Sequence, residues 1–365
     1  MEEANDNIVD PKDAAESVGL SYVSDETPGI TRRKAGRGWS YRDPKGRILK
    51  DRDTIERIDK LAIPPAYTAV WICPDPNGHL QATGRDARGR KQYRYHARFR
   101  EVRDGTKYEH MIAFAQSLPT IRRAVAEHMA MRGLPREKVL ATVVHLLETT
   151  MIRVGNADYA KQNKSYGLTT LANRHVRIDG TELRFRFKGK SGKEWNLKIR
   201  DRRVARIVRQ SQELPGQQLF QYIDEDGERK GVTSGDVNEY LKTISGTAIT
   251  AKDFRTWTGT VLAALALAEL ERFDSKAAAK RNVRTAIEQV AARLGNTPTV
   301  CRKCYIHPEI IESYLADALV LEVKQEVERE LAEDVEGLRP EEALVLAFLQ
   351  QRLARKADAI QADAA

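Results

Sequence analysis

The chain has 365 residues, of which 41% are hydrophobic, so it is long enough for two domains that each bury a core. Lysine and arginine number 61 against 52 acidic residues, and the resulting net charge of +9 favours a polyanionic partner. Three cysteines exclude a disulfide framework, and the sequence shows neither a signal peptide nor an apolar run long enough to span a membrane, so we expect a cytoplasmic protein.

The first segment of the chain is acidic. Residues 1–29 hold eight acids and one base, whereas residues 31–60 hold eleven bases and five acids. A short, highly charged segment of one sign buries too little apolar surface to fold alone. We therefore predict an acidic, disordered arm over residues 1–29, followed by a basic body.

Short β-prone runs separated by glycine-containing turns follow the arm. These runs occupy residues 39–41, 69–73, 80–83 and 92–95. Runs of this length and composition between turn signals are typical of strands. The sequence therefore predicts a small β-rich domain over residues 30–110.

Beyond residue 110 the hydrophobic period becomes that of helices, apart from one insert. The helices are predicted at 119–131, 136–153, 202–213, 234–243, 257–272, 276–294, 308–331 and 340–357. The insert has strand patterns at 175–178, 183–187 and 194–199, and the turn before the last strand puts Lys190 at a hairpin tip. We predict a mainly helical domain with a small antiparallel sheet over residues 111–320, and a helical extension over residues 321–365.

Five local motifs in this second domain offer the parts for breaking a phosphodiester without a metal. Such a reaction needs a nucleophile, charge for the pentacoordinate phosphate and a proton for the departing oxygen. The candidates are Arg153 in Ile-Arg-Val-Gly, Lys190 in Gly-Lys-Ser-Gly, Arg255 in Lys-Asp-Phe-Arg-Thr, Asn296 in Gly-Asn-Thr-Pro, and Tyr305 after Cys-Arg-Lys-Cys. Taken singly, an arginine is usually a solvated or paired side chain and a tyrosine a half-buried one, so the prediction depends on the combination.

Each candidate suits one role. Tyr305 would attack as a phenolate that nearby cations favour, and the planar forks of Arg153 and Arg255 would bind phosphate oxygens. Lys190, on a hairpin tip, would donate a proton to the 5′ oxygen. Asn296 would offer its amide N–H to a non-bridging oxygen.

In this order and setting the motifs resemble the type IB DNA topoisomerases, in their poxvirus-like and bacterial branch, over about residues 30–320. The resemblance implies an α+β protein whose β-rich and helical domains form a clamp on duplex DNA. It implies relaxation of supercoils through a 3′-phosphotyrosyl intermediate, with no ATP, metal or other cofactor, by a monomer associated with the nucleoid. Many relatives carry histidine at the position of Asn296, and asparagine keeps the donor but removes a titrating group.

The resemblance extends to the β-rich domain, where residues 81–95 are similar to the family's groove-contacting segment. It implies DNA contacts by Arg85, Arg90, Lys91, Gln92 and Tyr93, and by Tyr159 beside the Arg153 motif. The alternative interpretation of this segment is an amphipathic strand with a charged face.

Two other function classes share these residues. Tyrosine recombinases use similar chemistry, but they usually carry histidine where this chain has Lys252, and their N-terminal domain is helical. A non-catalytic DNA-binding protein would use the same basic surfaces without needing the tyrosine. Cys301 and Cys304 could form half a zinc site or a redox pair, but a zinc site needs four ligands, so we favour two ordinary helix cysteines.

Overall fold

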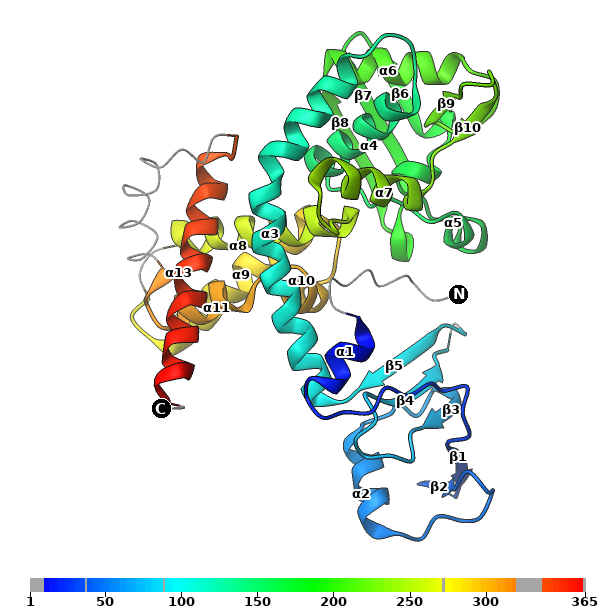
Figure 1. Cartoon of the computed structure of the whole chain (residues 1–365), viewed down its shortest axis with the longest axis vertical. Helices are drawn as coiled ribbons and strands as arrows, with labels where there is room; N and C mark the ends of the chain where they lie inside the picture. Colours follow the sequence, from blue (N-terminus) through cyan, green and yellow to red (C-terminus); the bar gives the residue numbers. More distant parts are fainter. Residues whose placement is uncertain (1–9, 37, 88, 271–272, 320–336, 364–365) are drawn as a thin grey trace. The chain divides into compact units, whose positions relative to one another are not determined.

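The computed structural model describes residues 10–36, 38–87, 89–270, 273–319 and 337–363. The chain divides into two compact units, Met1–His110 and Met111–Ala365, and α3 (Ala97–Ala130) runs from the first into the second (Figure 1). Unit 1 is built on a five-stranded antiparallel sheet, whereas unit 2 is mainly helical and carries smaller sheets of three and two strands. The predicted α+β fold class is confirmed.

The sheet of unit 1 has the strand order β2-β1-β3-β4-β5. Its strands are β1 (Ile30–Ala35), β2 (Gly38–Arg42), β3 (Thr68–Ile72), β4 (Leu80–Arg85) and β5 (Lys91–Tyr95). Helix α2 (Arg52–Lys60), which the sequence analysis does not predict, contributes Ile58 to the buried cluster of this unit. The other buried members of the cluster all come from the sheet: Ile30, Tyr41, Val70, Ile72 and Ala82.

Residues 10–29 pack against the rest of unit 1, so the prediction of a disordered arm is wrong for this part of the chain. Helix α1 (Pro11–Glu16) begins after Asp10, whose carboxylate accepts a backbone hydrogen bond at 2.7 Å. The segment buries small apolar side chains beside α3, in a cluster of Ala14, Ala15, Leu20 and Phe99. The excess of acids in the arm concealed these few apolar contacts. Residues 1–9 lie outside the described residues.

Helix α3 begins well before the predicted start at Pro119. Proline often opens a helix, which is why the prediction placed the start there. A proline inside a helix removes one hydrogen bond, and packing of the apolar face can offset that loss. Here Phe114, Ala115 and Leu118, in the turn before Pro119, are fully buried, and the helix continues through the proline.

Unit 2 consists of helices with a three-stranded and a two-stranded sheet. Its helices after α3 are α4 (Arg136–Thr150), α5 (Ala157–Asn163), α6 (Arg202–Glu213), α7 (Ser234–Ser245), α8 (Ala251–Glu269), α9 (Lys276–Leu294), α10 (Pro298–Cys304), α11 (Pro308–Leu315) and α13 (Pro340–Asp363). Its strands are β6 (Val176–Asp179), β7 (Glu182–Lys188), β8 (Glu194–Arg200), β9 (Gln221–Ile223) and β10 (Arg229–Gly231). Short 3₁₀ turns lie at η1 (Leu168–Thr170), η2 (Asn173–His175) and η3 (Lys190–Gly192). The predicted insert is thus confirmed as β6-β7-β8, with Lys190 in the turn between β7 and β8.

Several helix ends differ from the prediction, and among them the predicted helix over residues 136–153 ends at Thr150, before Arg153. Helix α8 begins at Ala251, because the N–H and the hydroxyl of Thr250 both donate to the Asp253 carboxylate at its start, at 2.8 and 2.9 Å. The predicted helix over residues 308–331 ends at Leu315, and Asp317 then takes a left-handed φ of 57°. The rest of that prediction, over residues 320–336, lies outside the described residues.

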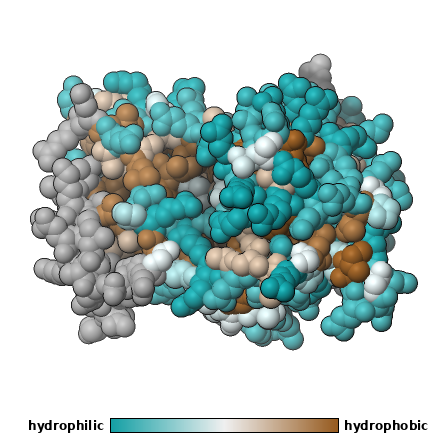
Figure 2. All heavy atoms as spheres, turned by 90° about the horizontal axis from the view of Figure 1, so that it is seen from above, coloured by the Kyte–Doolittle hydropathy of each residue, from teal (hydrophilic) through white to brown (hydrophobic). Residues whose placement is uncertain are grey.

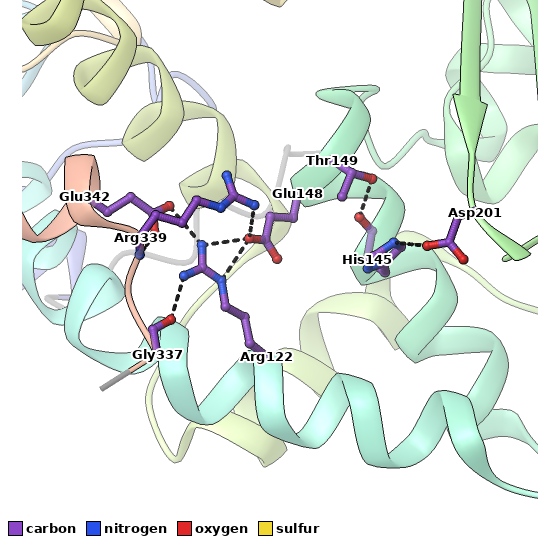
Figure 3. A network of polar contacts seen from close by, with 8 residues as sticks. All are labelled: Arg122, His145, Glu148, Thr149, Asp201, Gly337, Arg339 and Glu342. Atoms are coloured by element: carbon purple, nitrogen blue, oxygen red, sulfur yellow. Dashed lines mark hydrogen bonds and ion pairs between the residues drawn. The ribbon is translucent and has the colours of Figure 1, made fainter. Parts of the chain in front are cut away.

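Helix α13 is fixed to unit 2 by paired charges (Figure 3). Arg122 of α3 lies 2.7 Å from Glu148 of α4 and 2.8 Å from Glu342 of α13. Burial alone would raise the pKa of the Glu342 carboxyl, but its hydrogen bonds from Arg122 and the backbone outweigh that effect and lower it. Further along α13, Arg352 lies 2.8 Å from the buried Glu309 of α11. Helix α13 is therefore part of the framework of unit 2.

Hydrophilic residues cover most of the face drawn in Figure 2, as expected for a chain in which 31% of residues are charged. Among the described residues, no helix is both long enough and apolar enough to cross a membrane.

Candidate active site

Tyr305 follows the last residue of α10 and rests against α8. Its backbone N–H closes α10 by donating to the Cys301 carbonyl at 2.9 Å. On α8, a Cβ added to Gly259 would lie 2.5 Å from the Tyr305 carbonyl oxygen, closer than real contacts allow. The hydroxyl of Thr260 lies 3.4 Å from the same oxygen and accepts a hydrogen bond from the His307 N–H at 3.1 Å. Gly259 and Thr260 thus fix the backbone on both sides of the phenol.

Arg255 lies on α8, one turn before Gly259, and is only 3% exposed. Its guanidinium donates to the carbonyls of Met151 and Leu294. Its Cζ lies 5.2 Å from the centroid of the Tyr305 ring, within the range of a cation–π contact. The guanidinium therefore joins the ends of α4 and α9 to the tyrosine. Two of its nitrogens are used in these hydrogen bonds to the backbone.

Arg153 lies in the loop after α4, because Met151 takes a left-handed φ of 59° and ends that helix. The loop is held by a close approach of two glycines: a Cβ on Gly167 would lie 2.5 Å from the Arg153 carbonyl oxygen and 2.6 Å from Gly155 Cα. The Leu168 N–H also donates to the Arg153 carbonyl at 2.9 Å. The backbone that carries Arg153 is therefore tightly constrained.

Asn296 follows α9, which ends at Gly295 with a φ of 68°. The Asn296 backbone N–H returns to the Ala291 carbonyl at 2.9 Å, a common way of closing a helix. Its side-chain oxygen accepts a hydrogen bond from Arg153. That contact identifies the oxygen, so the other amide atom, Nδ2, is a donor.

Two side-chain donors of this group are buried and have no hydrogen-bond acceptor among the described residues. They are Asn296 Nδ2 and Arg255 Nε. Buried donors are nearly always satisfied, and leaving one unpaired costs about 1–3 kcal/mol. Both belong to the group that contains Tyr305 and Arg153. A phosphate oxygen would satisfy such donors.

The charges of the site favour an anion. Burial lowers the pKa of the Arg255 guanidinium from its ordinary value, and the positive charge of Arg153 lowers it further. Tyr305 acts in the opposite direction and raises this pKa, through the attraction between a phenolate and the cation and through a side-chain hydrogen bond with the guanidinium. Two neighbouring guanidiniums repel each other until an anion neutralises them, so bound phosphate or ionised phenol is stabilised here.

Lys190 stands apart from this group, on the exposed turn η3. Its ammonium lies 5.9 Å from the centroid of the Tyr159 ring, which α5 supplies. The structure thus links four of the predicted catalytic residues. Arg153 contacts Asn296, Arg255 contacts Tyr305, and the two arginines repel each other. Lys190 lies beside Tyr159 instead.

The predicted DNA contacts of unit 1 lie on the β4–β5 hairpin and several already have partners. Arg85 is opposite Lys91 in the ladder, and Thr83 is opposite Tyr93, so these four share one face of the sheet. Lys91 pairs with Asp25 at 2.8 Å, and Tyr93 stacks on Tyr95. Arg90 and Gln92 both bond to the Asp86 carboxylate, whose position next to the turn orients them. Arg85 donates to the Gly89 carbonyl at 2.9 Å.

Sequence reasoning missed three residues that build the site: Gly259, Thr260 and Trp195. A glycine within the apolar pattern of a helix often marks a close backbone approach, so Gly259 carried a signal. Trp195 reads as an ordinary strand residue, and only the structure reveals that it touches Gly189 and Gly295.

Two family models match the chain. One described as Bacterial DNA topoisomerase IB, N-terminal domain, matches residues 38–86. The other, described as Eukaryotic DNA topoisomerase I, catalytic core, matches residues 96–333 and so includes all five candidate catalytic residues. Helix α13 lies beyond the matched residues.

Viral proteins with related names are similar to most of the chain. DNA topoisomerase 1B of Acanthamoeba polyphaga mimivirus is 34% identical over 293 residues, which cover 78% of this chain and 87% of the viral protein. DNA topoisomerase 1B of Vaccinia virus (strain Copenhagen) is 25% identical over 284 residues, 73% of this chain and 83% of the viral protein. DNA topoisomerase 1 of Rabbit fibroma virus (strain Kasza) is 21% identical over 324 residues, which cover 80% of this chain and 94% of the viral protein.

Proposed function

This chain belongs to the type IB DNA topoisomerases, and from that premise we propose that Tyr305 cuts one strand of supercoiled duplex DNA and later reseals it. The intermediate is a 3′-phosphotyrosyl bond, and neither ATP nor a metal takes part. The alternatives of a tyrosine recombinase and of a non-catalytic DNA-binding protein do not fit the two topoisomerase matches, which cover both units. Duplex DNA is the proposed substrate.

The observation that carries this proposal is the pair of unsatisfied buried donors beside a tyrosine and two arginines. Donors that are fixed before the substrate arrives stabilise the pentacoordinate phosphate without having to reorganise. Arg255 Nε and Asn296 Nδ2 would each donate to a non-bridging oxygen. The charges of Arg153 and Arg255 would offset the negative charge that develops there.

In the cleavage step the Tyr305 oxygen attacks phosphorus while the bond to the 5′ oxygen breaks. The phenol proton passes to solvent, and the departing oxygen takes a proton from the Lys190 ammonium and leaves as a hydroxyl. Rotation of the cut strand then relaxes the supercoils. In religation the hydroxyl returns its proton to Lys190 and attacks phosphorus, and Tyr305 leaves as a phenolate that regains its proton from solvent. The covalent link conserves the bond energy, so no ATP is consumed.

Unit 1 would supply groove contacts through the β4–β5 hairpin. Tyr93 is exposed, and Arg85 and Lys91 lie on the same face, so these three suit contacts with phosphates and bases. A phosphate at Lys91 would compete with Asp25 for the same ammonium. Arg90 and Gln92, which Asp86 holds at the turn, would meet the groove edge, and Tyr159 would lie beside the scissile phosphate with Lys190.

The function is tested with supercoiled plasmid in EDTA without ATP. We expect relaxation of both negatively and positively supercoiled plasmid, with protein attached to the 3′ side of a nick when the reaction is stopped by detergent. Relaxation that requires Mg²⁺ or ATP, or protein on the 5′ side, would contradict the proposal.

Replacing Lys190 by alanine separates proton donation from charge stabilisation. We expect Lys190→Ala to cleave normal DNA about 10²–10⁴ times more slowly than the wild type, because the basic 5′ oxygen then leaves without a proton donor. Cleavage should recover when sulfur replaces that oxygen, because a thiolate leaves without a proton. The measurement is single-turnover cleavage of paired oxygen and sulfur substrates at the site that the wild-type enzyme cuts. Equal defects on both substrates would remove Lys190 as the acid.

A further inference from the structure

We propose that Trp195 is a positioning residue that docks the Lys190 turn onto the corner carrying Asn296, so that the proton donor and the phosphate-binding groups act as one site. The inference rests on the proposed function, because it takes Lys190 as the acid. Trp195 lies on β8, five residues after Lys190, and is half-buried. Its indole contacts Gly189, which precedes Lys190, and Gly295, which precedes Asn296.

The first contact is with Gly189, the residue before Lys190. A Cβ at Gly189 would lie 2.7 Å from Trp195 Nε1 and 2.8 Å from Cδ1. Real Cβ atoms do not come that close, so the five-membered edge of the indole lies directly against the Gly189 backbone. Gly189 also closes the turn, because its N–H donates to the Lys193 carbonyl at 2.7 Å. The indole therefore supports the base of the turn that carries Lys190.

The second contact is with Gly295, the residue before Asn296. A Cβ there would lie 3.2 Å from Trp195 Cζ2, on the six-membered edge of the same indole. Gly295 ends α9 with a φ of 68°, so its backbone sets the direction in which Asn296 leaves the helix. Lys193, in the same turn as Lys190, reaches the Ala292 carbonyl at 3.5 Å. A Cβ at Gly295 would also lie 3.3 Å from Lys193 Cδ, so the hairpin meets the end of α9 through both the indole of Trp195 and the side chain of Lys193.

The indole is itself held in place. Phe187 is paired with Trp195 in the β7–β8 ladder, and the two rings stack with centroids 5.9 Å apart and planes 3° apart. Phe187 is 7% exposed, so the stack fixes Trp195 to the core of the small sheet. A large flat side chain fixed at one face and touching two backbones at its edges is a rigid spacer.

A rigid spacer matters because proton transfer depends on distance. A donor must come within about 2.6–3.2 Å of the departing oxygen, and a misplacement of about 1 Å can cost a factor of 10². The Lys190 turn is short and exposed, and Ser191 in it has a left-handed φ of 62°. The turn therefore depends on neighbours for its position relative to Asn296 and Arg153.

The test compares Trp195→Ala, Trp195→Phe and Lys190→Ala in the full chain, on the oxygen and sulfur substrates described above. We expect Trp195→Ala to slow cleavage of the oxygen substrate by at least about 10-fold and to come within about threefold of wild type on the sulfur substrate. Trp195→Phe keeps the stack with Phe187 but cannot reach both glycines, so its rate should be intermediate. The double variant Lys190→Ala/Trp195→Ala should be no slower on the oxygen substrate than Lys190→Ala alone, because both changes remove the same proton transfer.

Gly189→Ala provides an independent variant that keeps the indole, should Trp195→Ala fold poorly. Its added methyl displaces the turn from Trp195, and the same selective loss on the oxygen substrate is expected. Equal losses on both substrates for Trp195→Ala and Gly189→Ala, or multiplicative losses in the double variant, would overturn this inference alone. Wild-type protein that forms no covalent adduct on either substrate would overturn the proposed function, and this inference with it.

Discussion

Tyr305→Phe is expected to abolish both relaxation and the covalent adduct while leaving noncovalent DNA binding nearly unchanged. The ring keeps its place above Arg255, so the site remains folded, but the attacking oxygen is gone. Binding should survive because many phosphate contacts supply most of the affinity, and one hydroxyl adds little. The measurements are plasmid relaxation, adduct formation in detergent, and DNA affinity at a fixed salt concentration.

A matched control for this change is Tyr222→Phe. Tyr222 is also a half-buried tyrosine of unit 2, but it lies on β9, away from the group around Arg255. The control should relax plasmid like the wild type. Adduct that persists in Tyr305→Phe would place the nucleophile elsewhere.

Arg255→Ala is expected to lower the cleavage rate by about 10²-fold or more, the scale of losing one preorganised charged donor. Affinity should fall much less, since the effect arises in the transition state. The change also leaves the carbonyls of Met151 and Leu294 without their donor, so we expect a lower free energy of unfolding, by about 1–3 kcal/mol for each buried group. Rates are measured in single turnover, well below the melting temperature of the variant.

Two companion variants separate catalysis from folding. Arg255→Lys keeps the charge but cannot span both carbonyls and a phosphate, so its rate should also be low. Arg153 is half-buried and its guanidinium contacts Asn296, so Arg153→Ala should lose a similar factor in rate with a smaller loss of stability. A near-wild-type rate in either alanine variant would exclude that arginine from the site.

Local patterns predicted the elements that present Lys190 and Asn296. Alternating apolar residues mark β7 and β8 with a glycine-rich turn between them, and this places Lys190 correctly. Helical periodicity between a serine cap and Gly295 gives α9 its observed bounds, Lys276–Leu294. Such elements are predictable because the signal is local and the hydrophobic face is clear.

Other parts of the fold depended on contacts that no local pattern carries. The acidic composition of residues 1–29 predicted disorder, and the few apolar contacts that dock α1 leave no clear pattern in the sequence. The helix predicted at 119–131 begins too late, because Pro119 resembles a helix start although it lies inside the long α3.

In the site, too, local motifs predicted some features and long-range contacts determine the others. The motifs around Arg153, Arg255, Asn296 and Tyr305 indicated the groups that the structure links, but not how they are held. The bonds from Arg255 to two helix ends, the close approach at Gly259 and the indole between Gly189 and Gly295 join residues far apart in sequence. A single sequence does not encode such distances in any local signal.

The central claim is that Tyr305 becomes linked to a 3′ phosphate, and the most direct test is to locate that link. The wild-type protein is incubated with DNA in EDTA without ATP, stopped with detergent, digested with nuclease and protease, and analysed by mass spectrometry. We expect a single modified peptide, containing Tyr305 joined to the 3′ phosphate of a nucleotide. A nucleotide on any other residue, or one joined through its 5′ phosphate, would contradict it.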